Sequence, residues 1–208
     1  MKDSKEAALD ALARLIMSWP GLVSRPAGDL IEDCLVLLDH LGEARRVVDV
    51  GSGGGLPGLP LKIMRPELEM TLVEADRNKA AFLVSACAQL GLAGVEVVDR
   101  RAEEVGRDPR HREAFDAAVA RAVAPMPVLA ELCLPLVRVG GRLLAQKTES
   151  EDISVAARAI HILGGAAPIV SRAPSQARQG GTVVRVDKVR PTPDAYPRRA
   201  GVPARKPL

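Results

Sequence analysis

The first forty residues carry apolar side chains at the spacing of amphipathic helices. Residues 5–17 predict one helix, which the turn at residues 19–21 ends. Asp29 is a candidate N-cap for a second helix that continues to Gly42. We therefore expect residues 1–44 to form a short helical N-terminal cap.

From residue 45 the pattern changes to short apolar runs that alternate with amphipathic segments. These runs predict strands at residues 46–50, 69–74, 95–98, 115–120 and 141–146. The intervening segments predict helices at residues 56–64, 76–91, 125–137 and 151–163. Strands that alternate with helices in this way form a parallel sheet covered on both faces.

Two further runs, near residues 167–171 and 182–188, lie too close together for a crossover helix. We therefore expect them to pair antiparallel. The predicted fold class is α/β, a Rossmann-like, seven-stranded, mostly parallel sheet with helices on both faces. This domain spans residues 45–190, and a basic, Pro-rich C-terminal tail follows at residues 191–208.

Composition narrows the class of protein. The 208 residues are 47% apolar, and no apolar stretch is long enough to cross a membrane. The charged N-terminus is unlike a signal peptide, so we expect a cytoplasmic monomer without a membrane partner. An odd number of cysteines without paired spacing argues against a disulfide framework or a zinc site, and no metal is expected. We expect Cys34, Cys87 and Cys133 to be small core residues.

Charge is unevenly distributed along the chain. The net charge is +3, but residues 185–208 hold seven cations and only two anions. This basic end suggests a phosphate-rich partner, and a solvated tail explains it equally well. Aromatic residues make up only 2% of the chain, which argues against a module that binds single-stranded bases by stacking.

Residues 49–58, DVGSGGGLPG, form a glycine-rich loop between the first strand and its helix. Such a loop brings a ligand close to the backbone at a helix N-terminus, as dinucleotides and S-adenosylmethionine require. The carboxylate of Asp49 would repel a pyrophosphate, whereas S-adenosylmethionine carries an ammonium there. Asp49 either orders the loop or faces that ammonium, directly or through water. The pattern therefore favours S-adenosylmethionine as the cofactor.

Three later positions fit the same ligand. Glu74 ends the second strand, where an acidic residue holds ribose hydroxyls. The stretch Arg101-Ala102-Glu103 follows the third strand, where the adenine ring should lie. Arg121 ends the fourth strand and is placed to meet cofactor or substrate, with a surface ion pair as the alternative.

At these motifs the sequence resembles the ribosomal RNA small subunit methyltransferase G family (RsmG, formerly GidB). The resemblance rests on the glycine loop with its Gly-Leu-Pro-Gly extension, on Arg65-Pro66, and on residues 101–103 and 120–122. It covers residues 45–148 and returns in the ending at residues 196–203. It implies a class I fold and methylation of guanine N7 in 16S ribosomal RNA, on the naked RNA or on the small ribosomal subunit.

The resemblance also assigns roles to individual residues. It implies cofactor contacts at Gly51 and Leu56, a ribose site at residues 74–76, and an adenine site at Ala102 and Glu103. Further members of the expected cofactor site are Asp49, Gly53, Gly55, Glu74, Ala75, Asp76 and Arg121. Arg121 is the expected catalytic residue at the junction of cofactor and substrate. The expected RNA contacts are Lys147, Arg198 and Arg199.

Two stretches depart from the family pattern. Members carry an Arg-His pair before an Asp-Ser-Leu run, and here Asp33 and Leu35 match but the basic pair does not. Members often have Arg-His before the last strand, where this chain has Arg178-Gln179. Both departures lie outside the glycine loop, so they concern substrate recognition.

The sequence lacks the motifs of methyltransferases that act on carbon or on exocyclic amines, which agrees with a ring nitrogen as the methyl acceptor. No cysteine follows a proline at a strand end, as pyrimidine C5 methylation requires. Residues 120–125, ARAVAP, are unlike the Asn/Asp-Pro-Pro-aromatic loop of exocyclic amine methylation. Guanine N7 offers a lone pair and loses no proton, so positioning suffices. The alternatives are a nicotinamide-dependent oxidoreductase, a methyltransferase for another RNA or a protein, and a non-catalytic paralogue.

Overall fold

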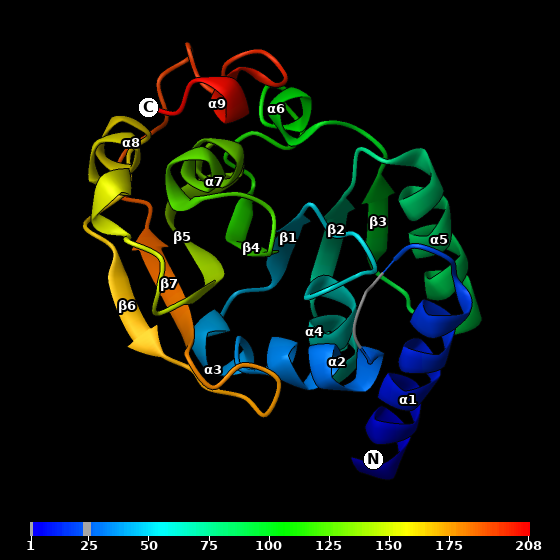
Figure 1. Cartoon of the computed structure of the whole chain (residues 1–208). Helices are drawn as coiled ribbons and strands as arrows, with labels where there is room; N and C mark the ends of the chain where they lie inside the picture. Colours follow the sequence, from blue (N-terminus) through cyan, green and yellow to red (C-terminus); the bar gives the residue numbers. More distant parts are fainter. Residues whose placement is uncertain (1, 23–25) are drawn as a thin grey trace.

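The computed structural model describes residues 2–22 and 26–208 (Figure 1). Its centre is one seven-stranded sheet in the order β3-β2-β1-β4-β5-β7-β6. The strands are β1 (Arg46–Val50), β2 (Glu69–Val73), β3 (Val95–Val98), β4 (Phe115–Arg121), β5 (Val137–Thr148), β6 (Ile169–Arg172) and β7 (Gly181–Asp187). The first five run parallel, and β7 pairs antiparallel with both β5 and β6. The predicted fold class and the antiparallel final pair are therefore confirmed.

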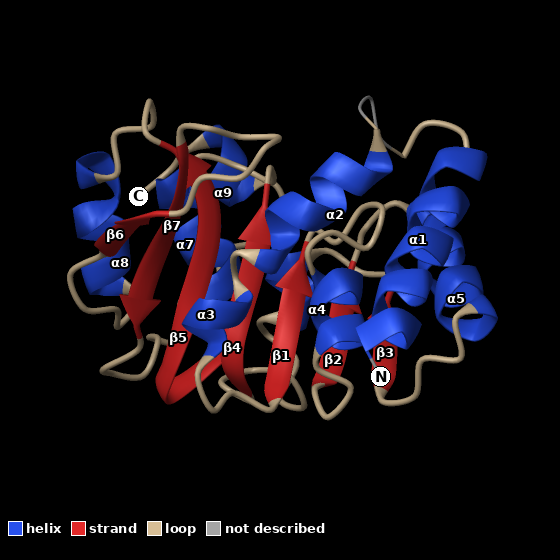
Figure 2. Ribbon diagram, turned by 90° about the horizontal axis from the view of Figure 1, so that it is seen from below, coloured by secondary structure: helices blue, strands red, loops and turns tan. Residues whose placement is uncertain are grey.

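Helices cover both faces of the sheet because neighbouring strand residues point to opposite sides. Val47 of β1 packs into one apolar core, and the adjacent Val48 packs into the other. On the Val47 side lie α1 (Lys2–Ser18), α2 (Ala27–Leu35), α3 (Leu38–Leu41), α4 (Gly58–Met64) and α5 (Arg77–Gln89). On the other side lie α7 (Met126–Cys133) and α8 (Ala157–Ile162) (Figures 1 and 2). The short α6 (Ala102–Val105) and α9 (Val202–Arg205) complete the described fold.

Several predicted helix boundaries are wrong for identifiable reasons. Asp29 is not an N-cap, because α2 begins at Ala27 directly after Pro26, whose fixed φ suits a helix start. The second helix of the cap also breaks after Leu35, and α3 follows separately. The helix predicted to reach residue 137 stops at Cys133, because Pro135 has no N–H to continue the ladder.

Two other helices are shorter than predicted. The helix expected from residue 56 begins at Gly58, with Pro57 as its N-cap. The helix expected from residue 151 begins as a 3-10 turn at Ser154, because Asp152 accepts hydrogen bonds from both the backbone N–H and the hydroxyl of Ser154.

The C-terminal segment, residues 191–208, packs along the domain. The guanidinium of Arg112 donates to the carbonyl oxygens of Thr192 and Tyr196, and Arg107 donates to that of Pro197. Figure 1 shows the segment lying over α6, α7 and α8. The interpretation of this segment as a solvated tail is therefore wrong, and α9 within it was not predicted.

The cysteines follow the expectation from composition. Cys34 and Cys133 are buried, Cys87 is half-buried, and all three are free. Burial raises the pKa of the Cys34 and Cys133 thiols well above the ordinary value, so both stay protonated. Within residues 2–22 and 26–208, no helix has the length and apolar character that a membrane span requires.

Candidate functional site

The glycine loop follows β1 at the carboxyl edge of the sheet, where the ends of β2, β4 and β5 also lie. Gly51, Gly53 and Gly55 all have positive φ angles, a conformation that favours glycine. A Cβ at Gly51 would lie 2.9 Å from a methyl carbon of Val123. The loop thus passes too close to the segment after β4 to carry a side chain at this position.

Asp49 lies directly beneath the loop and is fully buried. Its Oδ2 accepts a hydrogen bond from Gly58 N at 2.9 Å, which fixes the start of α4, while Oδ1 has no partner among the described residues. Burial raises the pKa of Asp49 to about 7, and the charge of Glu74 acts in the same direction. Of the two predicted roles, this geometry supports ordering of the loop. The contact with a cofactor ammonium stays a prediction.

Glu74 connects the ends of β1 and β2. Its Oε2 accepts from Gly53 N at 2.8 Å, and its Oε1 accepts from Asp76 N at 2.8 Å. Asp76 in turn caps α5 through its Oδ1, which accepts from the backbone N–H groups of Asn78 and Lys79. The predicted cap is confirmed, and Glu74 is held where it can also accept from a ligand hydroxyl.

A cavity of about 200 Å³ lies beside these groups. Its wall includes Gly51, Glu74, Ala75, Ala102 and Glu103, five of the residues predicted to bind the cofactor. The six other predicted residues do not line it. Arg121 lines a second cavity, described below, and Gly55 packs against Leu59. Leu56 is buried in the core on the α4 side, and Asp49, Gly53 and Asp76 support the wall through the hydrogen bonds described above.

Glu103 makes an unexpected contact with the C-terminal segment. Its Oε1 accepts from Gly201 N at 2.8 Å and lies 3.3 Å from the Arg101 guanidinium, while the buried Oε2 has no partner. Burial raises the pKa of Glu103, but these hydrogen bonds outweigh it and hold the pKa below the ordinary value. The segment therefore holds one residue of the cavity wall without lining the cavity itself.

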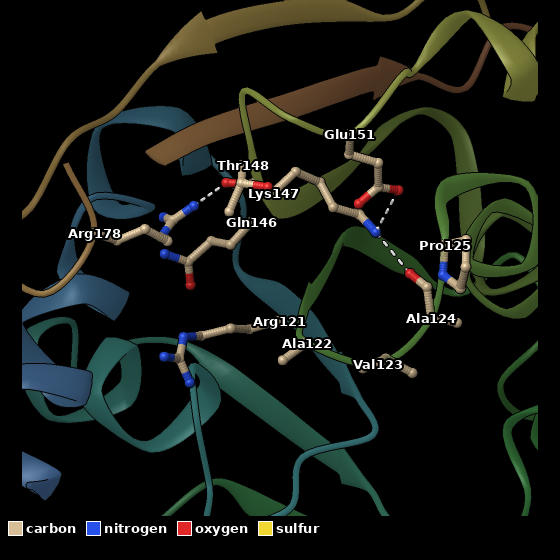
Figure 3. Close-up of a pocket in the computed structure, with 10 residues that line it drawn as sticks. All are labelled: Arg121, Ala122, Val123, Ala124, Pro125, Gln146, Lys147, Thr148, Glu151 and Arg178. Carbon is tan, nitrogen blue, oxygen red and sulfur yellow. Dashed lines mark hydrogen bonds and ion pairs between the residues drawn. The ribbon is translucent and has the colours of Figure 1, made fainter. Parts of the chain in front are cut away.

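A second cavity of about 410 Å³ adjoins the first, and Val123 lines both (Figure 3). Arg121 and residues 122–125 form its wall after β4, residues 146–148 contribute from β5, and Arg178 contributes from the β6–β7 loop. Figure 3 shows the Arg121 and Arg178 side chains on the same side of this cavity. We call it the arginine cavity.

Asp33 on α2 joins the two arginines. Its carboxylate accepts from Arg121 Nε at 3.2 Å, from Arg178 Nε at 3.0 and 3.2 Å, and from the Ser175 hydroxyl at 2.7 Å. Its backbone oxygen accepts from Gln146 Nε2 at 2.7 Å. Arg121 therefore lies in a buried ion pair rather than a surface one. In the sequence, Asp33 matched the family pattern and Arg178 lay in a stretch that departs from it. No feature of the sequence indicated that these two residues interact.

Lys147 lines the arginine cavity but its ammonium is already engaged. Nζ donates to Ala124 O at 2.6 Å and to Glu151 Oε1 at 2.9 Å, and its side chain is only 8% exposed (Figure 3). Glu151 also accepts from Met126 N, so it fixes the start of α7. The lysine shapes the cavity wall, and its predicted contact with RNA remains untested.

Arg198 is engaged in an ion pair within the protein, and its expected contact with RNA stays a prediction. Its guanidinium forms a two-pronged ion pair with Glu131 of α7, with distances of 2.6 to 3.1 Å, and its backbone N–H donates to the same carboxylate. The Glu131 side chain is only 1% exposed. Arg199 is exposed, as an RNA contact requires. No local pattern around residue 131 indicated this pair.

Several solved structures with a similar fold are methyltransferases. A tRNA methyltransferase from Aquifex aeolicus matches with a TM-score of 0.62 at 13% identity, over 86% of this chain and 76% of that one. An O-methyltransferase from Streptomyces achromogenes, solved in complex with S-adenosylmethionine, gives a TM-score of 0.59 at 21% identity, over 87% and 89% of the chains. These likenesses define the fold as the Rossmann-like fold of class I S-adenosylmethionine-dependent methyltransferases.

The sequence comparisons define the family. Residues 25–176 match the family described as rRNA small subunit methyltransferase G. The ribosomal RNA small subunit methyltransferase G of Moorella thermoacetica is 48% identical over 180 residues, covering 84% of this chain and 74% of that protein. Its counterpart from Roseiflexus sp. (strain RS-1) is 50% identical over 164 residues, covering 78% and 70%. The chain therefore belongs to the ribosomal RNA small subunit methyltransferase G family, as its glycine loop and strand-end motifs predicted.

Proposed function

We propose that this chain transfers a methyl group from S-adenosylmethionine to N7 of a guanine in 16S ribosomal RNA. One observation supports this proposal above the others. Two cavities meet at Val123 on the carboxyl edge of the sheet, one lined by the glycine loop and Glu74, the other by Arg121 and Arg178. The first suits a nucleoside cofactor, and the second suits an electron-rich base beside it.

The groups around the smaller cavity fit the cofactor. Glu74 in the cavity wall holds the ribose hydroxyls, and Gly51, which cannot carry a side chain beside Val123, brings the loop backbone to the ligand. Ala102 and Glu103 lie on the adenine side, where the unpartnered Oε2 of Glu103 can accept a hydrogen bond. Asp49 holds the loop through Gly58 N. When bound, S-adenosylmethionine supplies an electrophilic methyl group on its sulfonium.

The arginine cavity needs to position the base rather than to deprotonate it. Guanine N7 attacks with its own lone pair, so no general base takes part. Among the described residues that line this cavity, the one carboxylate is Glu151, and Lys147 and Met126 N already engage it. Arg121 lines this cavity close to Val123, which the two cavities share, and its N–H groups orient the substrate.

A transfer assay tests the proposal directly. The protein is incubated with radiolabelled S-adenosylmethionine and either naked 16S RNA or small subunits from a strain that lacks this methylation. The label is then mapped by chain cleavage specific for N7-methylguanosine. Label at one guanine supports the proposal and identifies the preferred form of the substrate. Label at another atom or another RNA would show a different methyltransferase, and cofactor binding without any label would show a non-catalytic relative.

A matched pair of variants tests the cofactor site. Glu69 and Glu74 lie at opposite ends of β2, and Glu69 is exposed. Glu74→Gln weakens the acceptor for ribose and should reduce cofactor affinity by about tenfold, as the loss of a charge-assisted hydrogen bond implies. Glu69→Gln should leave affinity unchanged within about twofold. Equal affinities in calorimetry would remove Glu74 from the site.

A further inference from the structure

The Asp33 carboxylate is the common partner of three side chains around the arginine cavity. It lies on α2 in the N-terminal cap, is fully buried, and accepts from Arg121, Ser175 and Arg178. These partners are 88 to 145 residues away along the chain. One carboxylate therefore connects the cap to the end of β4 and to the β6–β7 loop.

Hydrogen bonds fix the Arg178 side chain and leave one edge of its guanidinium available to a ligand. Nε donates to Asp33, and Nη1 donates to the carbonyl oxygens of Lys147 and Thr182. Nη2 is buried and has no partner in the part of the chain that the structure describes, although this side chain belongs to the cavity wall. A buried donor without an acceptor is costly, and a ligand oxygen that reaches Nη2 removes this cost.

Asp33 also holds Arg121 and Gln146 and leaves polar atoms of both side chains for the cavity. Among the described residues, Arg121 has one hydrogen-bond partner, the Asp33 carboxylate at Nε, which leaves its two terminal nitrogens for the cavity. Gln146 Nε2 donates to the backbone oxygen of Asp33, and its buried Oε1 has no partner within residues 2–22 and 26–208. The wall thus offers donors from two arginines and one acceptor, all oriented by Asp33.

We propose that Asp33 is a positioning residue for the substrate: it sets the orientation of Arg121, Arg178 and Gln146 in the arginine cavity. The inference rests on the proposed function, because it identifies this cavity as the substrate side. The two guanidinium groups exceed the one carboxylate by one positive charge. The cavity therefore favours oxygen acceptors, which a guanine nucleotide carries.

The cap does not need this carboxylate to pack against the domain. Leu30, Ile31 and Cys34 of α2 are buried in the core beside it. Buried ion pairs often contribute little net stability compared with apolar side chains of similar size. The charged network around Asp33 is therefore better explained by its role in orienting the two arginines than by a role in attaching α2 to the domain.

The test uses Asp33→Asn, which keeps a hydrogen-bond acceptor but removes the charge. The matched control is Asp29→Asn, the same change at an exposed position of the same helix. In the transfer assay with small subunits, Asp33→Asn should raise KM for the subunit by about tenfold or more. Cofactor affinity should stay within about twofold, and Asp29→Asn should match the unaltered protein in both.

Amide hydrogen exchange gives a readout that does not depend on activity. The β6–β7 loop is closed by backbone hydrogen bonds between Ser175 and Arg178 and between Ala173 and Gly181. Asp33→Asn should speed exchange at these amides and leave those of residues 51–58 unchanged. A general loss of protection, with cofactor affinity and melting temperature falling together, would show that Asp33 serves the fold alone and would overturn the proposal.

A double-variant cycle tests whether Asp33 acts through Arg178. If it does, Asp33→Asn combined with Arg178→Gln should raise KM by clearly less than the product of the two single effects. Independent, multiplicative effects would overturn the proposal, as would an unchanged KM in Asp33→Asn. No transfer by the unaltered protein would instead contradict the proposed function, and the exchange experiment would still decide whether Asp33 positions the loop.

Discussion

The glycine loop on the cofactor side is held by contacts between residues close in sequence, whereas the Asp33 network at the arginine cavity joins distant residues. Asp49 reaches Gly58 across nine residues, and Glu74 reaches Gly53 across 21. Asp33, by contrast, reaches Arg178 across 145 residues. A site built from one short loop leaves a readable motif, while a site built from distant segments leaves only isolated charged residues. The predictions below test this difference.

The largest effect is expected where the C-terminal segment joins α7. Arg198→Ala leaves the buried Glu131 carboxylate without its counter-charge, and we expect the free energy of unfolding to fall by about 3–5 kcal/mol. Arg199→Ala, at the exposed neighbouring position, should change it by less than about 0.5 kcal/mol. Denaturant unfolding measures both. Similar stabilities would mean that this long-range pair does not hold the C-terminal segment against α7.

The next effect concerns pH and the cofactor side. The pKa of Asp49 in the folded protein is about 7, above its unfolded value of 3.8, so the folded state retains the proton between these values. The free energy of unfolding should therefore fall by about 1.4 kcal/mol for each pH unit from pH 4 to 7, through this group alone. Asp49→Asn should remove that slope because an amide does not titrate, while its oxygen still accepts from Gly58 N. Asp99→Asn, at an exposed position, should keep the slope in thermal unfolding.

A smaller effect is expected from added volume in the loop. A Cβ at Gly58 would lie 2.5 Å from Leu72 Cδ2 and 2.8 Å from Asp49 Oδ2. Gly58→Ala should lower stability by about 2 kcal/mol and weaken cofactor binding measured by calorimetry. Gly28→Ala in α2 meets open space and should stabilise the protein by up to about 1 kcal/mol. Full cofactor affinity in Gly58→Ala would show that the contact between Asp49 and Gly58 is dispensable for the cofactor side.

The smallest effect belongs to the exposed end of the chain. Arg199→Ala should reduce the salt dependence of RNA binding by about 0.7–0.9 in the log–log slope, the contribution of one phosphate contact. Affinity should fall equally for RNAs of different sequence. An unchanged slope in a filter-binding titration would show that Arg199 does not contact a phosphate of the RNA.

The sequence predicted the order of strands and helices because periodicity and turn residues act locally. The capping of α5 by Asp76, the antiparallel final pair and the wall positions of Gly51, Glu74 and Ala102 all came from short stretches. Errors occurred where one residue changes a helix end, as at Pro26 and Pro135. Such boundaries depend on a single missing N–H or a fixed φ, which hydrophobic spacing does not report.

The partners of charged side chains were decided by the tertiary structure alone. Arg198 and Arg199 are neighbours with the same charge, yet one neutralises Glu131 and the other is exposed to solvent. Asp33 matched a family position, but only the packing of α2 against the ends of β4 and β5 brought it to Arg121. By itself the sequence determined the sheet, the cofactor loop and the family. The fold decided which cations remain free for a substrate, because burial and pairing are properties of residues brought together from distant parts of the chain.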